Sequence, residues 1–264
     1  MTEKAILADR DEWGVVTVTF NRPHVNNAYN DEFIQGVLDG LDMLEEDAGL
    51  RAVVLRGNGR HFQAGADLKW INSVRPGSRA ANREASRKTA AVIDRLNNLP
   101  VPVVALVQGG CFGGGTGVIS ACDVVIAADN AIFSISEVRW GLHAAIIVPH
   151  LNDAIGVRQV RRYALTGERF DATEARRIGL VHEVVALDKL EARGAEIVSQ
   201  ILENSTSAMA FTKQHILESA WGGLDQSALD YLIDSHAAAR QSADAAEGLA
   251  SFAEKRQAAW APKK

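Results

Sequence analysis

The chain has 264 residues, of which 47% are hydrophobic and 23% are charged, a composition typical of a globular protein with a sizeable core. Its 28 basic and 33 acidic side chains give a formal net charge of −5 at pH 7, which argues against a general nucleic-acid-binding or basic membrane-surface protein. Two cysteines, Cys111 and Cys122, are too few for a disulfide framework and predict free thiols in a reducing compartment. The first residues lack the pattern of a signal peptide, and no apolar stretch reaches the length of a membrane span. We therefore expect a cytoplasmic protein without nucleic-acid or membrane partners.

Strand and helix patterns alternate through the first two thirds of the chain. Residues 13–20 predict a first strand, and Asn30 predicts the N-cap of a helix whose apolar side chains recur at helical spacing. Short apolar runs of the kind found in strands covered on both faces occur at 52–56, 103–107, 124–127 and 182–185. Together these segments predict an α/β fold with a largely parallel sheet.

From about Leu187 onward the pattern is helical. Breaks at 204–206 and 222–223 divide this region into separate helices. The last helix is expected to carry Phe252, Arg256 and Trp260 on one face.

Two glycine-bearing loops, 63–69 and 113–117, each lie between an apolar strand and a helical segment. Small residues let a ligand reach the backbone, and two such loops on neighbouring strands can point two N–H groups at one oxygen. This is the geometry of an oxyanion hole, although glycines also serve tight turns and close packing alone.

Other chemistries lack their motifs. No phosphate-loop or dinucleotide fingerprint is complete, the histidines and cysteines have no metal-site spacing, and no serine lies in a nucleophile elbow. We therefore expect no metal and no redox cofactor, which leaves enolate chemistry as the natural candidate for an oxyanion hole.

Six motifs, in their order and spacing, resemble the crotonase (enoyl-CoA hydratase/isomerase) superfamily over nearly the whole chain. They are FQAGADLK at 62–69, GGG at 113–115, ACD at 121–123, SE at 136–137, LTG at 165–167 and FAEKR at 252–256. The resemblance implies an α/β fold of the ClpP/crotonase type, a spiral of ββα turns with two roughly perpendicular sheets. Residues 1–195 would form the core with an acyl-CoA site, and 196–264 a helical oligomerisation region. It also implies an acyl-CoA thioester as substrate, no separate cofactor, and homotrimers that can pair into hexamers.

The resemblance also assigns site residues. The two oxyanion-hole N–H groups would be those of Ala66 and Gly114, holding the thioester oxygen as it becomes an enolate. Residues in contact with substrate or CoA would be Ala66, Asp67, Leu68, Lys69, Gly114 and Lys255. The last of these would reach the nucleotide phosphates as a point charge. Outside this context, Asp67 would be a loop or helix cap and Lys255 a solvated helix residue.

Hydratases of this family typically use two glutamates, and this chain keeps only the second, Glu137. Gly117 stands at the position of the first. A lone carboxylate in an apolar pocket has a raised pKa, which suits proton transfer near neutrality, whereas a Glu137 paired with Arg139 would be structural. Three hypotheses stay open. Glu137 alone hydrates a substrate whose branch or carboxylate uses the space at Gly117; Glu137 shuttles one proton as a Δ3-Δ2 enoyl-CoA isomerase; or His143 replaces the missing group.

Gly117 and the segment 136–151 resemble the branch of the family that acts on 3-branched glutaconyl-CoAs, of the isohexenylglutaconyl-CoA type of terpene breakdown or the 3-methylglutaconyl-CoA type of leucine breakdown. A substrate carboxylate needs a cation, and Arg139 and His143 are candidates because both follow Glu137 closely. His143 can equally be a packed histidine bonded to the backbone. The alternative to an enzyme is an acyl-CoA-binding protein that lost its first glutamate, although the retained Glu137 argues against it.

Overall fold

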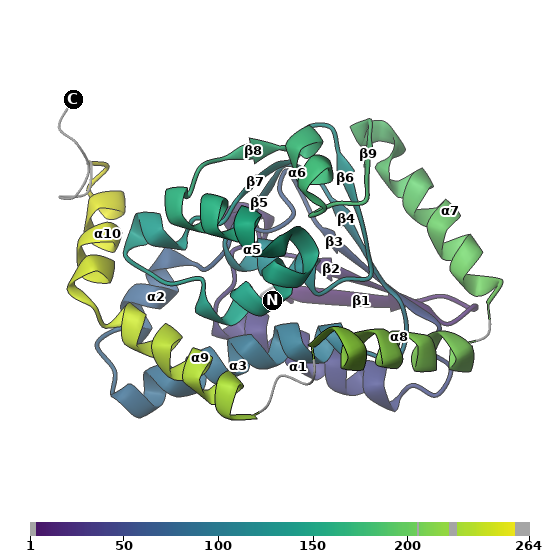
Figure 1. Ribbon diagram of the computed structural model, residues 1–264, viewed down its shortest axis with the longest axis horizontal. Helices are drawn as coiled ribbons and strands as arrows, with labels where there is room; N and C mark the ends of the chain where they lie inside the picture. Colours follow the sequence, from purple (N-terminus) through teal and green to yellow (C-terminus); the bar gives the residue numbers. More distant parts are fainter. Residues whose placement is uncertain (1–3, 205, 222–225, 257–264) are drawn as a thin grey trace.

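The computed structural model describes residues 4–204, 206–221 and 226–256, which form two β-sheets surrounded by helices (Figure 1). The larger sheet has the order β1-β2-β3-β4-β6-β9, and the smaller has the order β5-β7-β8. Their strands are β1 (Ile6–Arg10), β2 (Val15–Phe20), β3 (Ala52–Gly57), β4 (Val103–Val107), β5 (Gly110–Phe112), β6 (Val124–Ala128), β7 (Ile132–Ser134), β8 (Phe170–Asp171) and β9 (Glu183–Val185). All pairs are parallel except β1 with β2 and β7 with β8. The predicted α/β fold and largely parallel sheet are confirmed.

Each long strand of the larger sheet leads into a short strand or bridge in a second layer. β4 is followed by β5, and β6 by β7, which pairs with β5. After β3, Gln63 forms a parallel bridge with Cys111 of β5, and after β2, Tyr29 forms a parallel bridge with Ala66. This repeated step is the expected spiral of ββα turns, and it brings loops far apart in sequence to one edge.

Helices follow the strands and cover both faces of the larger sheet. They are α1 (Asp31–Glu46), α2 (Leu68–Val74), α3 (Arg79–Asn97), α4 (Gly114–Ser120), α5 (Val148–Thr166), α6 (Ala172–Ile178), α7 (Leu190–Leu202), α8 (Thr206–Trp221), α9 (Gln226–Arg240) and α10 (Ala243–Ala253). Four short 3₁₀ turns are η1 (Pro23–Val25), η2 (Glu137–Trp140), η3 (Ala145–Ile147) and η4 (Leu187–Lys189). Asn30 caps α1, as predicted, because its side chain accepts the N–H of Phe33.

The two faces of the larger sheet bury separate clusters. The main core lies on the side of α1 and α3, while α7 covers the opposite face with Leu190 and Ile197 packed near Val104 and Leu106. The predicted boundary at residue 195 falls inside α7, a single helix that contacts β3, β4 and β6. By its contacts, the whole of α7 belongs with the sheet.

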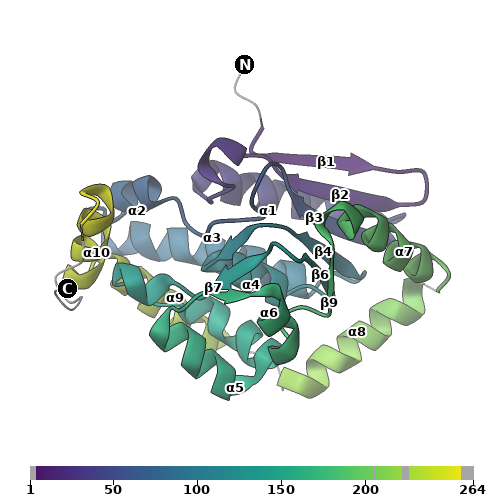
Figure 2. The same ribbon diagram turned by 90° about the horizontal axis from the view of Figure 1, so that it is seen from above.

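α9 and α10 pack against elements from earlier parts of the chain. α9 packs along α3, and Figures 1 and 2 agree that α10 lies beside α2 at one end of the molecule. α10 ends at Ala253, and Lys255 has φ +53°, so the expectation that Arg256 continues this helical face is wrong. Trp260 lies outside the described residues. Oligomerisation through this region stays a prediction.

Among the residues described, no helix has the length and apolar character to cross a membrane. In the same part of the chain, no cluster of three histidine, cysteine or acidic side chains is placed to hold a metal ion. Cys111 and Cys122 are free thiols, as predicted.

Candidate active site

The two glycine-bearing loops lie against each other at the edge of the second layer. The N–H of Phe112 donates to the carbonyl of Gln63, and the N–H of Gln63 donates to the carbonyl of Gly110. Gly65 has φ +83°, and a Cβ added there would lie 3.1 Å from the carbonyl oxygen of Phe112. Glycine is therefore required both for the backbone conformation and for the close approach of the loops.

Two backbone N–H groups at this junction have no acceptor within the described chain. Tyr29 bridges Ala66 by accepting from the N–H of Asp67 and donating to the carbonyl of Gly65, so the N–H of Ala66 points to the opposite side. Gly114 is the first residue of α4, where an N–H has no intrahelical partner. The structure thus places the two predicted donor residues on adjacent loops.

The carboxyl group of Glu137 lies next to this junction. A Cβ added to Gly113, which has φ +50°, would lie 3.0 Å from Oε1 of Glu137. Oε2 is fully buried and has no hydrogen-bond partner among the described residues. Burial raises the pKa of Glu137 from its usual value of 4.5 to about 7, against a smaller opposing effect of its own backbone N–H. The predicted lone, desolvated carboxyl is present, so both of its protonation states are populated near neutral pH.

Gly117 does not leave open space beside Glu137. A Cβ added at Gly117 would lie only 2.2 Å from Cγ2 of Ile147 and 3.4 Å from Cδ1 of Ile93. The expectation that a substrate branch uses the space of the missing glutamate is therefore wrong, because Ile147 already fills it.

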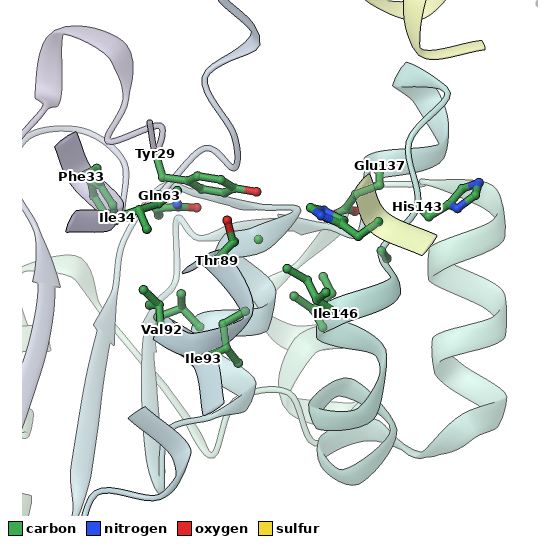
Figure 3. Close-up of a pocket in the computed structure, with 15 residues that line it drawn as sticks. Tyr29, Phe33, Ile34, Gln63, Thr89, Val92, Ile93, Glu137, His143 and Ile146 are labelled. Atoms are coloured by element: carbon green, nitrogen blue, oxygen red, sulfur yellow. The ribbon is translucent and has the colours of Figure 1, made fainter. Parts of the chain in front are cut away.

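Neither candidate cation from the sequence points at Glu137. His143 is exposed, and in Figure 3 its ring points away from Glu137 and from the centre of the pocket. Arg139 is also exposed, and its Nε donates to the carbonyl of Gly167 at 2.8 Å. Within the described part of the chain, neither residue forms an ion pair with Glu137, so the structural alternative of a Glu137–Arg139 pair is absent.

An apolar pocket with a cavity volume of about 30 Å³ opens beside the Glu137 carboxyl (Figure 3). Its walls come from α1, α3, α4, η3 and α9, and its apolar lining is Tyr29, Phe33, Ile34, Val92, Ile93, Val118, Ala144, Ile146 and Ile147. Its polar lining includes Glu137, His143 and His236. Phe33, Val92 and Val118 also line a second apolar cavity of about 300 Å³ between α1 and the larger sheet. The acyl side of the site is therefore predominantly apolar.

Comparison with known proteins agrees with this geometry. The family model described as enoyl-CoA hydratase/isomerase matches residues 10–263. The chain belongs to this family. An enoyl-CoA hydratase from Shewanella pealeana has a crystal structure similar to this one, with a TM-score of 0.78, 33% identity, and coverage of 97% of this chain and 96% of that one. Pseudomonas aeruginosa AtuE has a TM-score of 0.80 and 37% identity, covering 98% and 100% of the two chains. Mevalonyl-coenzyme A hydratase sidH of Aspergillus fumigatus is 31% identical over 95% of this chain and 92% of its own.

Membership of the enoyl-CoA hydratase/isomerase family makes this protein an enzyme of a hydro-lyase family with an acyl-CoA substrate. The predicted superfamily is confirmed. The narrower branch acting on 3-branched glutaconyl-CoAs stays a prediction.

The predicted CoA segment forms the mouth of a large cleft that ends at the loop junction. Ala66, Asp67, Leu68 and Lys69 line this cleft together with Gly114 and Glu137. The side chain of Asp67 accepts the N–H of Lys69 as the N-cap of α2, and it pairs with Arg22 at 3.3 Å. Asp67 thus fixes the start of α2, and the exposed Lys69 lies at the mouth of the cleft.

The predicted phosphate contact of Lys255 has no counterpart in the lining of the cleft. Arg256 lines it instead, and its guanidinium pairs with Glu247 and Glu254, the latter at 2.6 Å. A role of Lys255 toward CoA stays a prediction.

Two residues that the sequence did not single out complete the site. The ring of Tyr29 lies against Gly114, where an added Cβ would be 2.7 Å from Cε1, and burial raises the pKa of its phenol to about 12. His236 of α9 lines both the cleft and the apolar pocket, and its Nδ1 lies 2.9 Å from Oγ of Ser86. Burial holds the pKa of His236 well below its usual value, which keeps the imidazole neutral. Neither residue belongs to a motif, so no sequence signal pointed to them.

Proposed function

We propose that this enzyme adds water to a branched 2-enoyl-CoA, with Glu137 as its single acid–base group. The observation that carries the proposal is the desolvated Glu137 carboxyl, unpartnered at Oε2 and packed against Gly113 beside two N–H groups that lack acceptors. Its pKa of about 7 matches the operating range of a group that must both take up and release a proton.

The proposed reaction uses these groups in one sequence. The Glu137 carboxylate takes a proton from water as the water oxygen bonds to C3. The electron pair of the C2–C3 double bond moves toward the thioester, whose oxygen becomes an enolate held by the N–H groups of Ala66 and Gly114. Glu137 then returns the proton to C2, so that one water is added and the carboxylate is restored. Because one carboxyl serves both steps, the hydroxyl and the proton arrive on the same face.

We further propose a 3-branched glutaconyl thioester as substrate, of the isohexenylglutaconyl-CoA or 3-methylglutaconyl-CoA type. The pocket beside Glu137 supports the apolar branch, since most of the side chains that line it are aliphatic or aromatic. A relative that is named as a hydratase of mevalonyl-CoA, a thioester branched at C3, supports the same substrate class.

A Δ3-Δ2 enoyl-CoA isomerase is the second candidate. It needs one proton shuttle and no activated water, and the glycine at 117 leaves one glutamate of the usual two. The same oxyanion hole would serve it, so product chemistry has to separate the two activities.

The deciding experiment is mass spectrometry after incubation in ¹⁸O-labelled water with isohexenylglutaconyl-CoA, 3-methylglutaconyl-CoA, crotonyl-CoA and a 3-enoyl-CoA. We expect a gain of one labelled water on the glutaconyl thioesters and little on crotonyl-CoA. Only a shifted double bond would identify an isomerase, and tight binding without any product would indicate an acyl-CoA-binding protein. The Glu137→Gln variant controls for uncatalysed hydration.

A further inference from the structure

Arg240, the last residue of α9, is a deeply buried cation that Asp31 of α1 influences electrostatically without forming an ion pair with it. Its side chain belongs to a residue that is only 2% exposed, yet it forms no ion pair within the described part of the chain. Its contacts are long: Nη1 lies 3.4 Å from the carbonyl of Asn82, Nη2 lies 3.3 Å from Nδ1 of His236, and Cζ lies 5.1 Å from the ring centre of Trp70. A guanidinium has five N–H donors, and a buried unpaired charge is strongly unfavourable, so this arrangement lacks an anion.

The unpaired guanidinium faces the active-site cleft. Arg240 and His236 line that cleft together with Glu137 and Gly114. Tyr29 lies between the loop junction and Arg240. Its ring touches Gly114 and also packs edge-on, at 5.7 Å, against Trp70, the ring that Arg240 contacts. Tyr29, Glu137 and Arg240 all line this one cleft, so the phenol, the carboxyl and the cation share the same cavity.

Further unused donors surround this position. The indole Nε1 of Trp70, whose ring lies under the Arg240 guanidinium, is buried without a hydrogen-bond partner among the described residues, and the hydroxyl of Tyr29 is a further neutral donor in the cleft. A site with a desolvated guanidinium and free neutral donors is suited to a carboxylate, which accepts several hydrogen bonds at once.

We propose that Arg240 binds a carboxylate at the far end of the acyl group and so selects dicarboxylic enoyl-CoA substrates. The inference rests on the proposed hydratase function and gives it a specificity residue. It replaces Arg139 and His143, the two cations suggested by the sequence: both line the site, but both are exposed to solvent, and Arg139 already donates to the carbonyl of Gly167.

The anion is an acyl carboxylate rather than a CoA phosphate. Phosphates of CoA carry several charges and remain hydrated, so they suit exposed cations such as Lys69 at the mouth of the cleft. Arg240 is almost fully removed from solvent, and it lines the cleft together with Tyr29 and His236, two residues that also line the apolar pocket.

The test compares two thioesters that differ only in the carboxylate, 3-methylglutaconyl-CoA and 3-methylcrotonyl-CoA. For the intact protein we expect kcat/KM to favour the carboxylated thioester. In Arg240→Met, the ratio of the two kcat/KM values should fall by about 10- to 100-fold, the usual effect of a hydrogen-bonded charge pair. Arg139→Met is the matched control, and we expect it to leave the ratio unchanged. Arg240→Lys keeps the charge and should lose only part of the preference, which covers the case of a poorly folded methionine variant.

Binding of the hydrated products, 3-hydroxy-3-methylglutaryl-CoA and 3-hydroxy-3-methylbutyryl-CoA, provides a second readout by calorimetry. The proposal is overturned if the intact protein shows no preference, if Arg240→Met lowers affinity for both products and for free CoA equally, or if Arg139→Met removes the preference. If neither unsaturated thioester gains water while the product preference still depends on Arg240, the hydratase function fails and the carboxylate site stands.

Discussion

The proposed active site has two halves that the chain builds by different means. The thioester half consists of backbone N–H groups and glycines on two loops, with one carboxyl from η2 held against Gly113. The acyl half consists of side chains from α1, α3, η3 and α9, segments that span more than two hundred positions of the sequence. The reaction is therefore encoded locally, at strand ends, whereas substrate preference depends on how distant helices pack. Changes in the two halves should have separable effects.

The largest effect is expected from Glu137→Gln, which keeps the shape of the thioester half and removes its titrating group. We expect kcat to fall by about 10²- to 10⁴-fold, with little change in the dissociation constant of CoA. Below pH 7 the active carboxylate of the unchanged enzyme becomes protonated, so its kcat/KM should rise with pH through about 7 and then level off. Glu84→Gln, which removes an exposed α3 carboxylate paired with Arg87, is the control and should change neither value. Near-normal turnover by Glu137→Gln would contradict the proposed role.

Glu137→Gln, which should lower activity, should raise the free energy of unfolding. The folded Glu137 carboxyl has a pKa of about 7 and the unfolded one about 4.5, so the folded state holds this proton more tightly and loses stability as pH rises between these values. The destabilisation grows from about 1 kcal/mol at pH 5 to about 3 kcal/mol at pH 8. Glu137→Gln should therefore gain about 2 kcal/mol relative to the unchanged enzyme over this range. Calorimetric unfolding at the two pH values measures this, and a pH-independent difference would mean that the carboxyl is solvated.

The acyl half can be tested at Gly117, where the structure contradicts the expectation of free space. Gly117→Ala should destabilise the protein by about 1–3 kcal/mol, because the new methyl group would overlap Ile147. Gly40→Ala is the control with the opposite sign: nothing lies within 4 Å of a Cβ added there, and alanine should stabilise α1 by up to about 1 kcal/mol. In a double-mutant cycle, Ile147→Ala should reduce the cost of Gly117→Ala by about 0.5 kcal/mol or more. Additive effects of the two substitutions would show that Ile147 does not cause the steric overlap at residue 117.

The sequence predicts the thioester half well because its determinants are short and local. Continuous apolar runs identify β3, β4 and β6, and the two glycine-bearing loops suggest an oxyanion hole. The resemblance to a family supplied its donor residues, Ala66 and Gly114. β1 was missed, since it is an edge strand with four of its five residues exposed and carries no apolar pattern. The resemblance to a family supplied Glu137, which no spacing rule alone singles out.

The acyl half could not be predicted, for two physical reasons. Tyr29, His236 and Arg240 are single side chains whose proximity arises from the packing of α9 on α3, and no local pattern records that contact. The space left by an absent side chain is also decided by its neighbours, as Ile147 shows at Gly117. Sequence neighbours of Glu137 were therefore poor guides to the cation that a substrate carboxylate would meet.

The smallest effect tests whether the C-terminal helices also support the thioester half. The ring of Phe252, on α10, meets Trp140 of η2 edge-on at 5.1 Å, and Trp140 ends the 3₁₀ turn that begins with Glu137. Phe252→Ala should lose about 1 kcal/mol of stability, a fall of about 2–4 °C in Tm for a chain of this size. Because Gly113 also holds the carboxyl, we expect kcat to fall by less than about tenfold, within the range of a misplaced catalytic group. Phe211→Ala, which removes a ring of similar exposure on α8, controls for the loss of surface apolar area. If the two variants lose equal stability and neither changes kcat, α10 packs on η2 without positioning Glu137, and the two halves of the site are built independently.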